Sequence, residues 1–110
     1  MKICEVYKCK RLALGMTQAE FANLVGVSGG TISRFELGEQ LSPAIFNAIR
    51  FGVENYIRQF ERQQYLQIRI LEEAYKLQYE PEAEKTKTLA HLMIHVSKLE
   101  LDLLNPNNEN

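Results

Sequence analysis

Apolar residues recur along most of the chain at intervals of three and four positions, the period at which side chains share one face of an α-helix. No segment alternates apolar and polar residues for long, and no Asn-Gly or Asp-Gly turn joins β-branched runs, so no strands are expected. The first helix is predicted over residues 3–14, with Gly15 as its stop. The pattern therefore favours an all-α fold.

Two short helices with well-marked ends follow. Thr17 begins a capping box, in which its hydroxyl accepts from the N–H of Glu20 and the Glu20 carboxylate reaches back to the cap. Gly26 ends that helix as a C-cap, and Ser28 caps the next one, which should run to about residue 37. Only a tight turn is therefore expected between the two helices.

The second half of the chain is expected to form longer helices. Ser42 and Pro43 have the N-cap and N1 pattern of a fourth helix, whose apolar stripe ends before Gly52. Residues 53–79 contain neither Gly nor Pro and carry apolar residues at helical spacing, although several glutamines interrupt the stripe. After a Glu-Pro pair, the last helix should cover residues 82–104. Together these segments predict a long helical hairpin.

The last predicted helix carries four leucines and a valine at spacings of 3, 4, 3 and 4, which is the seam of a helix that packs lengthwise on a partner. Further apolar residues widen this stripe beyond what one neighbouring helix covers. The partner could be the preceding segment of the same chain or a second copy. A dimer is favoured, because so wide a stripe would leave an apolar patch exposed in a monomer. The seam positions are Leu89, Leu92, Val96, Leu99 and Leu103.

The charges are almost balanced but unevenly placed. The chain carries 13 Lys and Arg against 14 Asp and Glu, a net charge of −1. Residues 1–40 hold five Lys and Arg against four Glu, whereas residues 80–110 hold three Lys against six acidic residues. Any surface for nucleic acid must therefore be local, and the C-terminal part should face away from phosphate.

Neither a signal peptide nor a membrane span is apparent. The first seven residues mix charged and apolar side chains, and no run approaches the ~18 apolar residues that a span requires. Cys4 and Cys9 are too few for a disulfide framework or a zinc site, and reduced thiols are expected. These observations favour a soluble, cytoplasmic protein without a membrane partner.

The segment 17–38 carries the most informative motif. Two short helices meet at a tight turn, with the small Ala22 where they cross, and this construction presents the second helix as a rod that fits the major groove of DNA. The motif consists of KR (10–11), GMTQ (15–18), EFA (20–22), Leu24, GVS (26–28), TISRFE (31–36) and Gly38. Over about residues 3–52 the sequence resembles the lambda-repressor-like helix-turn-helix domains, also called Cro-type or xenobiotic-response-element-type (XRE) domains.

The resemblance implies a role for particular residues. The glutamine that opens the second helix, here Gln18, would hold a DNA phosphate and brace the recognition helix, since free N–H groups at a helix N-terminus also attract phosphate. Arg11 and Glu36 would form a structural ion pair. Thr17 and Ser28 cap their helices, a role compatible with DNA contact. The implied DNA-binding residues are Thr17, Gln18, Ser28, Gly29, Gly30, Thr31, Ser33 and Arg34.

Gly29 and Gly30 depart from the family pattern, which often places Gln, Arg or Ser at these positions of the recognition helix. Glycine has no side chain with which to read a base. Three explanations stay open: a close approach of the backbone to DNA, a shift of base readout to Thr31, Ser33 and Arg34, or a helix that binds something else. Arg34 is the strongest candidate reader, because a guanidinium can bond guanine O6 and N7 together, although it could instead pair with a neighbouring glutamate.

Other candidate chemistry is weak. His91 and His95 have the spacing of a metal pair on a helix, but no third ligand is obvious, so no metal site or cofactor is expected. No phosphate-binding loop or nucleophile with its base is present, which predicts no enzyme. Lys8 and Lys10 could contact phosphates or simply solvate their helix.

The sequence therefore predicts an all-α regulator with three regions. Residues 1–52 form a lambda-repressor-like helix-turn-helix domain, residues 53–104 a helical dimerisation region, and residues 105–110 a disordered tail. A homodimer would bind double-stranded DNA at a pseudo-palindromic operator, with half-sites about one helical turn apart, and repress transcription. The alternative is a protein-interaction module of the same fold, an antitoxin or an inhibitor of a host factor, that holds its partner with the C-terminal helices. A non-specific architectural DNA binder is disfavoured by the pI of about 6.1.

Overall fold

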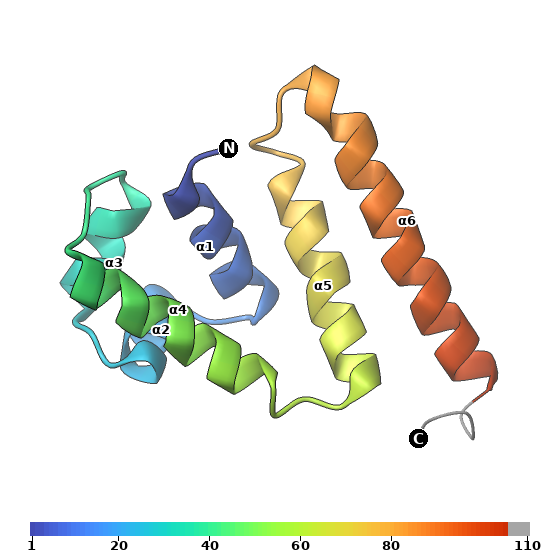
Figure 1. Cartoon of the computed structure of the whole chain (residues 1–110), viewed down its shortest axis with the longest axis horizontal. Helices are drawn as coiled ribbons and strands as arrows, with labels where there is room; N and C mark the ends of the chain where they lie inside the picture. The colour runs from blue at the N-terminus through green and yellow to red at the C-terminus, as the bar shows by residue number, and fades with distance from the viewer. Residues whose placement is uncertain (106–110) are drawn as a thin grey trace.

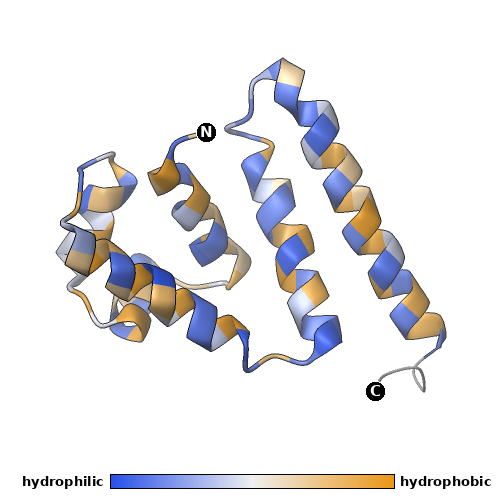
Figure 2. Cartoon of the chain, in the orientation of Figure 1, coloured by the Kyte–Doolittle hydropathy of each residue, from blue (hydrophilic) through white to orange (hydrophobic). Residues whose placement is uncertain are grey.

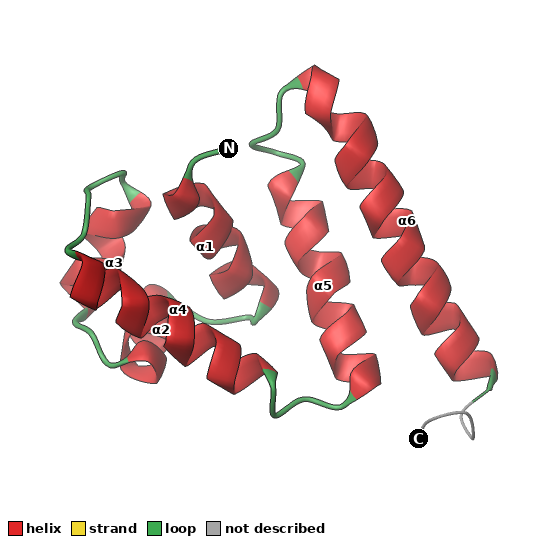
Figure 3. Cartoon of the chain, in the orientation of Figure 1, coloured by secondary structure: helices red, strands yellow, loops and turns green. Residues whose placement is uncertain are grey.

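The computed structural model describes residues 1–105, and every regular element in that span is a helix (Figure 3). The helices are α1 Ile3–Ala13, α2 Gln18–Val25, α3 Gly29–Glu36, α4 Pro43–Ile57, α5 Arg62–Lys76 and α6 Glu82–Leu104. The predicted all-α class is therefore confirmed. Asn105 caps the end of α6, and the rest of the predicted disordered tail, residues 106–110, lies outside the described residues.

The helices form two parts. One consists of α1 to α4, the other of α5 and α6, and α1 contacts both. Helices α1 to α4 pack around one another, and α5 lies between α1 on one side and α6 on the other (Figure 1). The molecule measures 43 Å along its longest axis, with α3 at one end of that axis and α6 at the other (Figure 1). The helix that the sequence assigns to DNA and the helix that it assigns to a partner are thus far apart.

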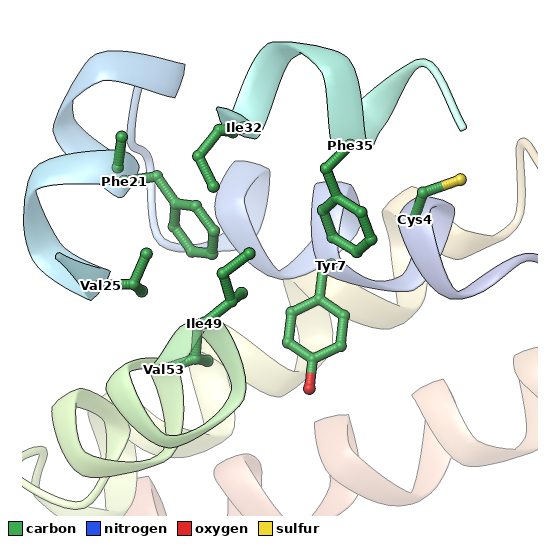
Figure 4. Packing of buried hydrophobic residues seen from close by; sticks show 9 residues of the cluster. Cys4, Tyr7, Phe21, Val25, Ile32, Phe35, Ile49 and Val53 are labelled. Carbon is green, nitrogen blue, oxygen red and sulfur yellow. The ribbon is translucent and has the colours of Figure 1, made fainter. Parts of the chain in front are cut away.

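A single apolar core holds α1 to α4 together (Figure 4). Phe21 of α2, Ile32 of α3 and Ile49 of α4 are almost fully excluded from solvent. The rings of Tyr7 and Phe46 meet edge-on with centroids 5.5 Å apart, in the arrangement that aromatic rings prefer. Burial of these side chains, rather than the helix propensity of such short segments, fixes how α2 and α3 are presented.

Local signals set the ends of α2 and α3 as predicted. The Thr17 hydroxyl accepts from the Glu20 N–H at 3.1 Å, and the Thr17 N–H donates to the Glu20 carboxylate at 3.0 Å. Gly26 ends α2 with a φ of 79°, a left-handed conformation that glycine adopts without strain. The Ser28 hydroxyl accepts from the Thr31 N–H at 3.1 Å and so begins α3.

The expected end of the fourth helix at Gly52 is wrong, because α4 continues to Ile57. A Cβ atom at position 52 would lie 2.9 Å from Val25 Cγ1 and 3.0 Å from Val25 Cα. Gly52 therefore serves the close packing of α4 on α2 and does not stop a helix. Val53 belongs to the buried core, so the boundary drawn at residue 52 falls inside a helix that the N-terminal core requires.

The continuous helix expected over residues 53–79 is also wrong. The chain leaves the helical path after Ile57, and α5 begins after Glu61, whose N–H donates to Gln64 Oε1 at 3.4 Å. The rings of Tyr56 and Phe60 pack edge-on across this turn, with centroids 5.1 Å apart. The hairpin therefore consists of α5 and α6, with a shorter first arm than the sequence predicted.

A buried carboxylate joins α5 to α1. Glu72 is 1% exposed, and its carboxylate lies 3.2 Å from Lys10 Nζ and 3.0 Å from Lys76 Nζ. Arg69 adds a third cation at 3.6 Å. Burial alone raises the pKa of the Glu72 carboxyl, but Lys10 and Lys76 more than offset this and hold the pKa below its usual value. A charged, fully paired cluster therefore connects the two parts of the fold.

Candidate nucleic-acid interface

Glu36, at the end of α3, is the centre of a buried polar brace. Its two carboxylate oxygens accept from Nε and Nη2 of Arg11 at 2.7 and 2.9 Å. The remaining Arg11 nitrogen, Nη1, donates to the Met16 carbonyl at 2.9 Å, and Gln18 Nε2 donates to Glu36 Oε1 at 3.0 Å. The bidentate pairing of Arg11 with Glu36 thus fixes α3 to α1 and to the start of α2.

The resemblance implies two roles for Gln18, a contact with a DNA phosphate and a brace for the recognition helix. Its side-chain amide joins α2 to α3 through Glu36, which is the bracing role. Gln18 is also the first residue of α2, where backbone N–H groups have no partner within the helix. A phosphate contact at this helix end stays a prediction.

The outer side of α3 is open. Gly29, Gly30 and Arg34 are exposed, and the Arg34 side chain keeps 60% of its surface accessible. Thr31 and Ser33 are half-buried, and the Thr31 hydroxyl lies 2.8 Å from the Ser28 hydroxyl. Helix α3 packs on α1 and α2, while α5 and α6 lie on the other side of the molecule (Figure 1). Among residues 1–105, the C-terminal helices therefore leave the predicted reading surface uncovered.

Arg34 has two neighbours on this surface. Its Nε lies 3.1 Å from Glu39 Oε2, just beyond the end of α3. Its guanidinium lies back over the first turn of α3, and Nη1 is 3.1 Å from the point that a Cβ atom at Gly30 would occupy. The possible pairing of Arg34 with a nearby glutamate is therefore present, but the side chain stays exposed at the surface where a base would be read.

The comparison with known families agrees with this geometry. Residues 2–51 match the family model HTH_3, described as helix-turn-helix. Residues 2–51 are a lambda-repressor-like helix-turn-helix domain. The family is one of DNA-binding transcription regulators, and the match spans α1 to α3, most of α4 and the whole Arg11–Glu36 brace. No curated protein and no solved structure gave a significant match to the chain.

Lys10 of the helix-turn-helix domain faces away from the predicted DNA surface. Its Nζ lies 3.2 Å from both carboxylate oxygens of Glu72 on α5. The expectation that Lys10 contacts phosphate or simply solvates α1 is therefore wrong, because its charge neutralises a buried carboxylate. The sequence could not indicate this contact, since the two residues lie 62 positions apart. Lys8 is half-buried, and its role stays a prediction.

The five positions of the predicted dimer seam divide between two faces of α6. Leu92, Val96 and Leu99 are half-buried on the side of α6 that packs against α5. Leu89 and Leu103 are exposed. The intramolecular hairpin therefore forms, whereas the dimer stays a prediction: apolar residues of α6, a helix with hydrophobic positions over much of its length (Figure 2), stay exposed from Leu89 to Leu104. The exposed large apolar residues of α6 are Leu89, Met93, Ile94, Leu101, Leu103 and Leu104.

The two histidines of α6 have different surroundings. His91 is exposed, whereas His95 is half-buried and its Nδ1 has no hydrogen-bond partner within residues 1–105. Burial and the nearby Arg69 charge lower the pKa of His95. Within the described part of the chain, no group of three or more His, Cys, Asp or Glu side chains could hold a metal ion. None of the helices from α1 to α6 is long and apolar enough to cross a membrane.

Proposed function

We propose that this protein is a sequence-specific transcriptional repressor that binds duplex DNA with α3 in the major groove. The observation that carries the proposal is the open outer side of α3, held rigidly by the buried Arg11–Glu36 pair while Arg34 stays accessible. A rigid element matters here, because base readout needs donors held at fixed positions relative to the duplex. Occupation of an operator would exclude other proteins from the same DNA.

The residues of the interface would make different kinds of contact with DNA. The N-terminus of α2, with Thr17 and Gln18, would bind a phosphate through its unpaired N–H groups and so fix the orientation of the domain. Ser28, Thr31 and Ser33 would add hydroxyl contacts along α3, and Gly29, over which no side chain lies, would let the backbone of its first turn come close to the DNA beside the guanidinium that lies over Gly30. Arg34 would read a guanine through O6 and N7.

The test is selection of bound sequences from a random duplex pool, followed by affinity measurements with variants. Arg34→Ala should cost about 1–3 kcal/mol on the best site and relax one base position. Arg62→Ala is the matched control, because Arg62 on α5 is also ion-paired and its side chain is 58% exposed. Wild-type affinity of Arg34→Ala for every duplex would refute the assignment of Arg34. Failure of the wild type to enrich any sequence would refute sequence-specific binding.

We further propose that the repressor is a homodimer formed through the exposed face of α6. Met93, Ile94, Leu101 and Leu104 stand on the side of α6 away from α5, with the small Ala90 among them. None of these five positions carries a charge, and the helix offers them over several turns. A twofold pairing of two α6 helices would bury the same residues on both copies, as an isologous interface requires.

The position of α6 bears on the operator. Because α3 and α6 lie at opposite ends of the 43 Å axis, pairing through α6 would carry the two recognition helices to the outer ends of the dimer. The half-sites should then lie farther apart than the one turn expected from the sequence, at about two turns of DNA (roughly 70 Å).

Light scattering tests the dimer. The wild type should have twice the monomer mass, and the double variant Met93→Glu/Leu101→Glu should be monomeric with an unchanged helical content. Leu71→Glu on α5 is the control, because it places one such charge at an exposed apolar position outside the proposed interface. A monomeric wild type would overturn the proposal and would leave the face to a different protein. Selected half-sites one turn apart would exclude pairing through α6.

A further inference from the structure

The two glycines at the start of α3 have different surroundings. No atom lies within 4 Å of the point that a Cβ atom at Gly29 would occupy, whereas a Cβ at Gly30 would lie 3.1 Å from Nη1 and 4.0 Å from Cζ of Arg34. Neither glycine has a positive φ within α3, so the backbone conformation requires glycine at neither position. At position 30 the constraint is instead steric, because a Cβ there would crowd the Arg34 guanidinium.

The direction of Arg34 follows from helix geometry. Side chains on a helix point toward its N-terminus, and residues four apart lie one above the other on the same face. The Arg34 guanidinium consequently lies over position 30, in the first turn of the recognition helix. The first turn is where helix-turn-helix proteins contact base edges, and here its own side chains are absent. Arg34 thus brings a charged group from the second turn into that place.

Glu39 contacts the same guanidinium at a different atom, Nε. Gly38, with a φ of 101°, turns the chain back after α3, and the Glu39 N–H donates to the Arg34 carbonyl at 3.1 Å. The Glu39 carboxylate then lies 3.1 Å from Arg34 Nε. The contact with Glu39 is made at Nε, so Nη1 and Nη2 are the nitrogens farther from that carboxylate. The two terminal nitrogens are therefore the donors left for a ligand.

We propose that Gly30 and Glu39 are positioning residues that hold Arg34 for end-on recognition of a guanine opposite the first turn of α3. Gly30 provides the space in which the guanidinium lies, and Glu39 occupies Nε so that Nη1 and Nη2 face the O6 and N7 acceptors of the base. This inference rests on the proposed function, since it specifies how the same surface reads its operator.

The ion pair with Glu39 does not prevent Arg34 from contacting DNA. Both side chains are more than half exposed, and an ion pair of this kind changes an equilibrium by about fivefold at most. That is less than a bidentate contact with guanine contributes to discrimination, which is about fivefold to more than a hundredfold. The pair therefore orients the arginine without preventing its contact with a base.

The test compares Gly30→Ala with Gly29→Ala, each in the wild-type and in the Arg34→Ala background. The measurement is affinity for the selected duplex and for the three duplexes that replace the guanine assigned to Arg34. Gly30→Ala should lower the preference for guanine about threefold to tenfold, because its Cβ displaces the guanidinium. Any steric loss from Gly29→Ala should apply equally to all four duplexes. In the Arg34→Ala background, Gly30→Ala should change the preference less than about twofold.

Glu39→Gln provides an independent second variant. It should lower the same preference about twofold to fivefold while leaving the thermal midpoint nearly unchanged, because the exposed ion pair contributes little to folding. Equal losses of preference in the two glycine variants, or a loss that persists without Arg34, would overturn the positioning role. A wild type that selects no sequence would overturn the proposed function itself, and this inference with it, so the two failures are distinguishable.

Discussion

The replacement Glu72→Gln tests the junction between the two parts of the fold. It removes one charge from a side chain that is 1% exposed and surrounded by the cations of Lys10, Lys76 and Arg69. Breaking a fully buried ion pair costs about 3–5 kcal/mol. Here the cations keep 19–28% of their side-chain surface in water and can partly rehydrate. The expected loss of unfolding free energy is therefore about 2–4 kcal/mol.

The loss of stability in Glu72→Gln should depend on pH. The pKa of the Glu72 carboxyl is lowered in the folded protein, so ionisation of Glu72 stabilises the fold above the unfolded pKa. This contribution is lost as the pH falls through the folded pKa, where wild-type Glu72 becomes neutral like glutamine. The stability difference between wild type and Glu72→Gln should therefore be largest near neutral pH and shrink as the pH falls through the lowered pKa of Glu72.

Urea denaturation followed by far-ultraviolet circular dichroism measures the difference at each pH. Glu73→Gln is the matched control, because Glu73 is also buried on α5 but its nearest cations, Arg69 and Lys76, lie at 3.6 and 3.7 Å. Its loss should be smaller than that of Glu72→Gln. A loss below about 1 kcal/mol for Glu72→Gln, or a difference that grows on acidification, would refute the reasoning.

Three further predictions concern the helix-turn-helix domain. Gly52→Ala should lower the unfolding free energy by about 1–3 kcal/mol in urea, despite the better helix propensity of alanine, because its Cβ would meet the Val25 backbone; a stabilised variant would contradict this packing. Cys9 should resist thiol reagents at pH 8 in the native protein, since burial, with the Glu72 charge, raises the pKa of its thiol to about 11; rapid native labelling of Cys9, identified by peptide mapping, would count against it. Glu36→Gln should cost about 2–4 kcal/mol and weaken binding to every duplex alike, because it leaves the buried Arg11 guanidinium without its carboxylate; a loss confined to one base pair would exclude a bracing role.

The parts of the fold that the sequence predicted are those set by neighbouring residues. The capping box at Thr17, the left-handed Gly26 and the Ser28 cap each act within four residues, so their spacing alone places the ends of α2 and α3. The Arg11–Glu36 pair joins residues 25 positions apart, and the family resemblance, not the local pattern, implied it.

The errors arose where one sequence feature has two physical meanings. Gly52 looks like a helix stop, but it allows close packing on Val25, and the local sequence is the same for both uses. The turn after Ile57, residues 58–61, contains neither Gly nor Pro, and three polar residues around Phe60 do not distinguish it from a helix. Helix α6 is apolar on more than one side, so its pattern could not assign Leu92 to the hairpin and Leu101 to the exposed face.

Helix α1 connects the C-terminal helices to the recognition helix α3. Its consecutive residues Lys10 and Arg11 point to opposite parts of the fold: Lys10 pairs with Glu72 of α5, and Arg11 pairs with Glu36 of α3. Because α5 also packs on α6, a continuous series of packed helices and paired charges runs from the exposed α6 face to the recognition helix. Glu72→Gln therefore removes the pairing of α1 with α5 and leaves the Arg11–Glu36 pairing of α1 with α3 in place.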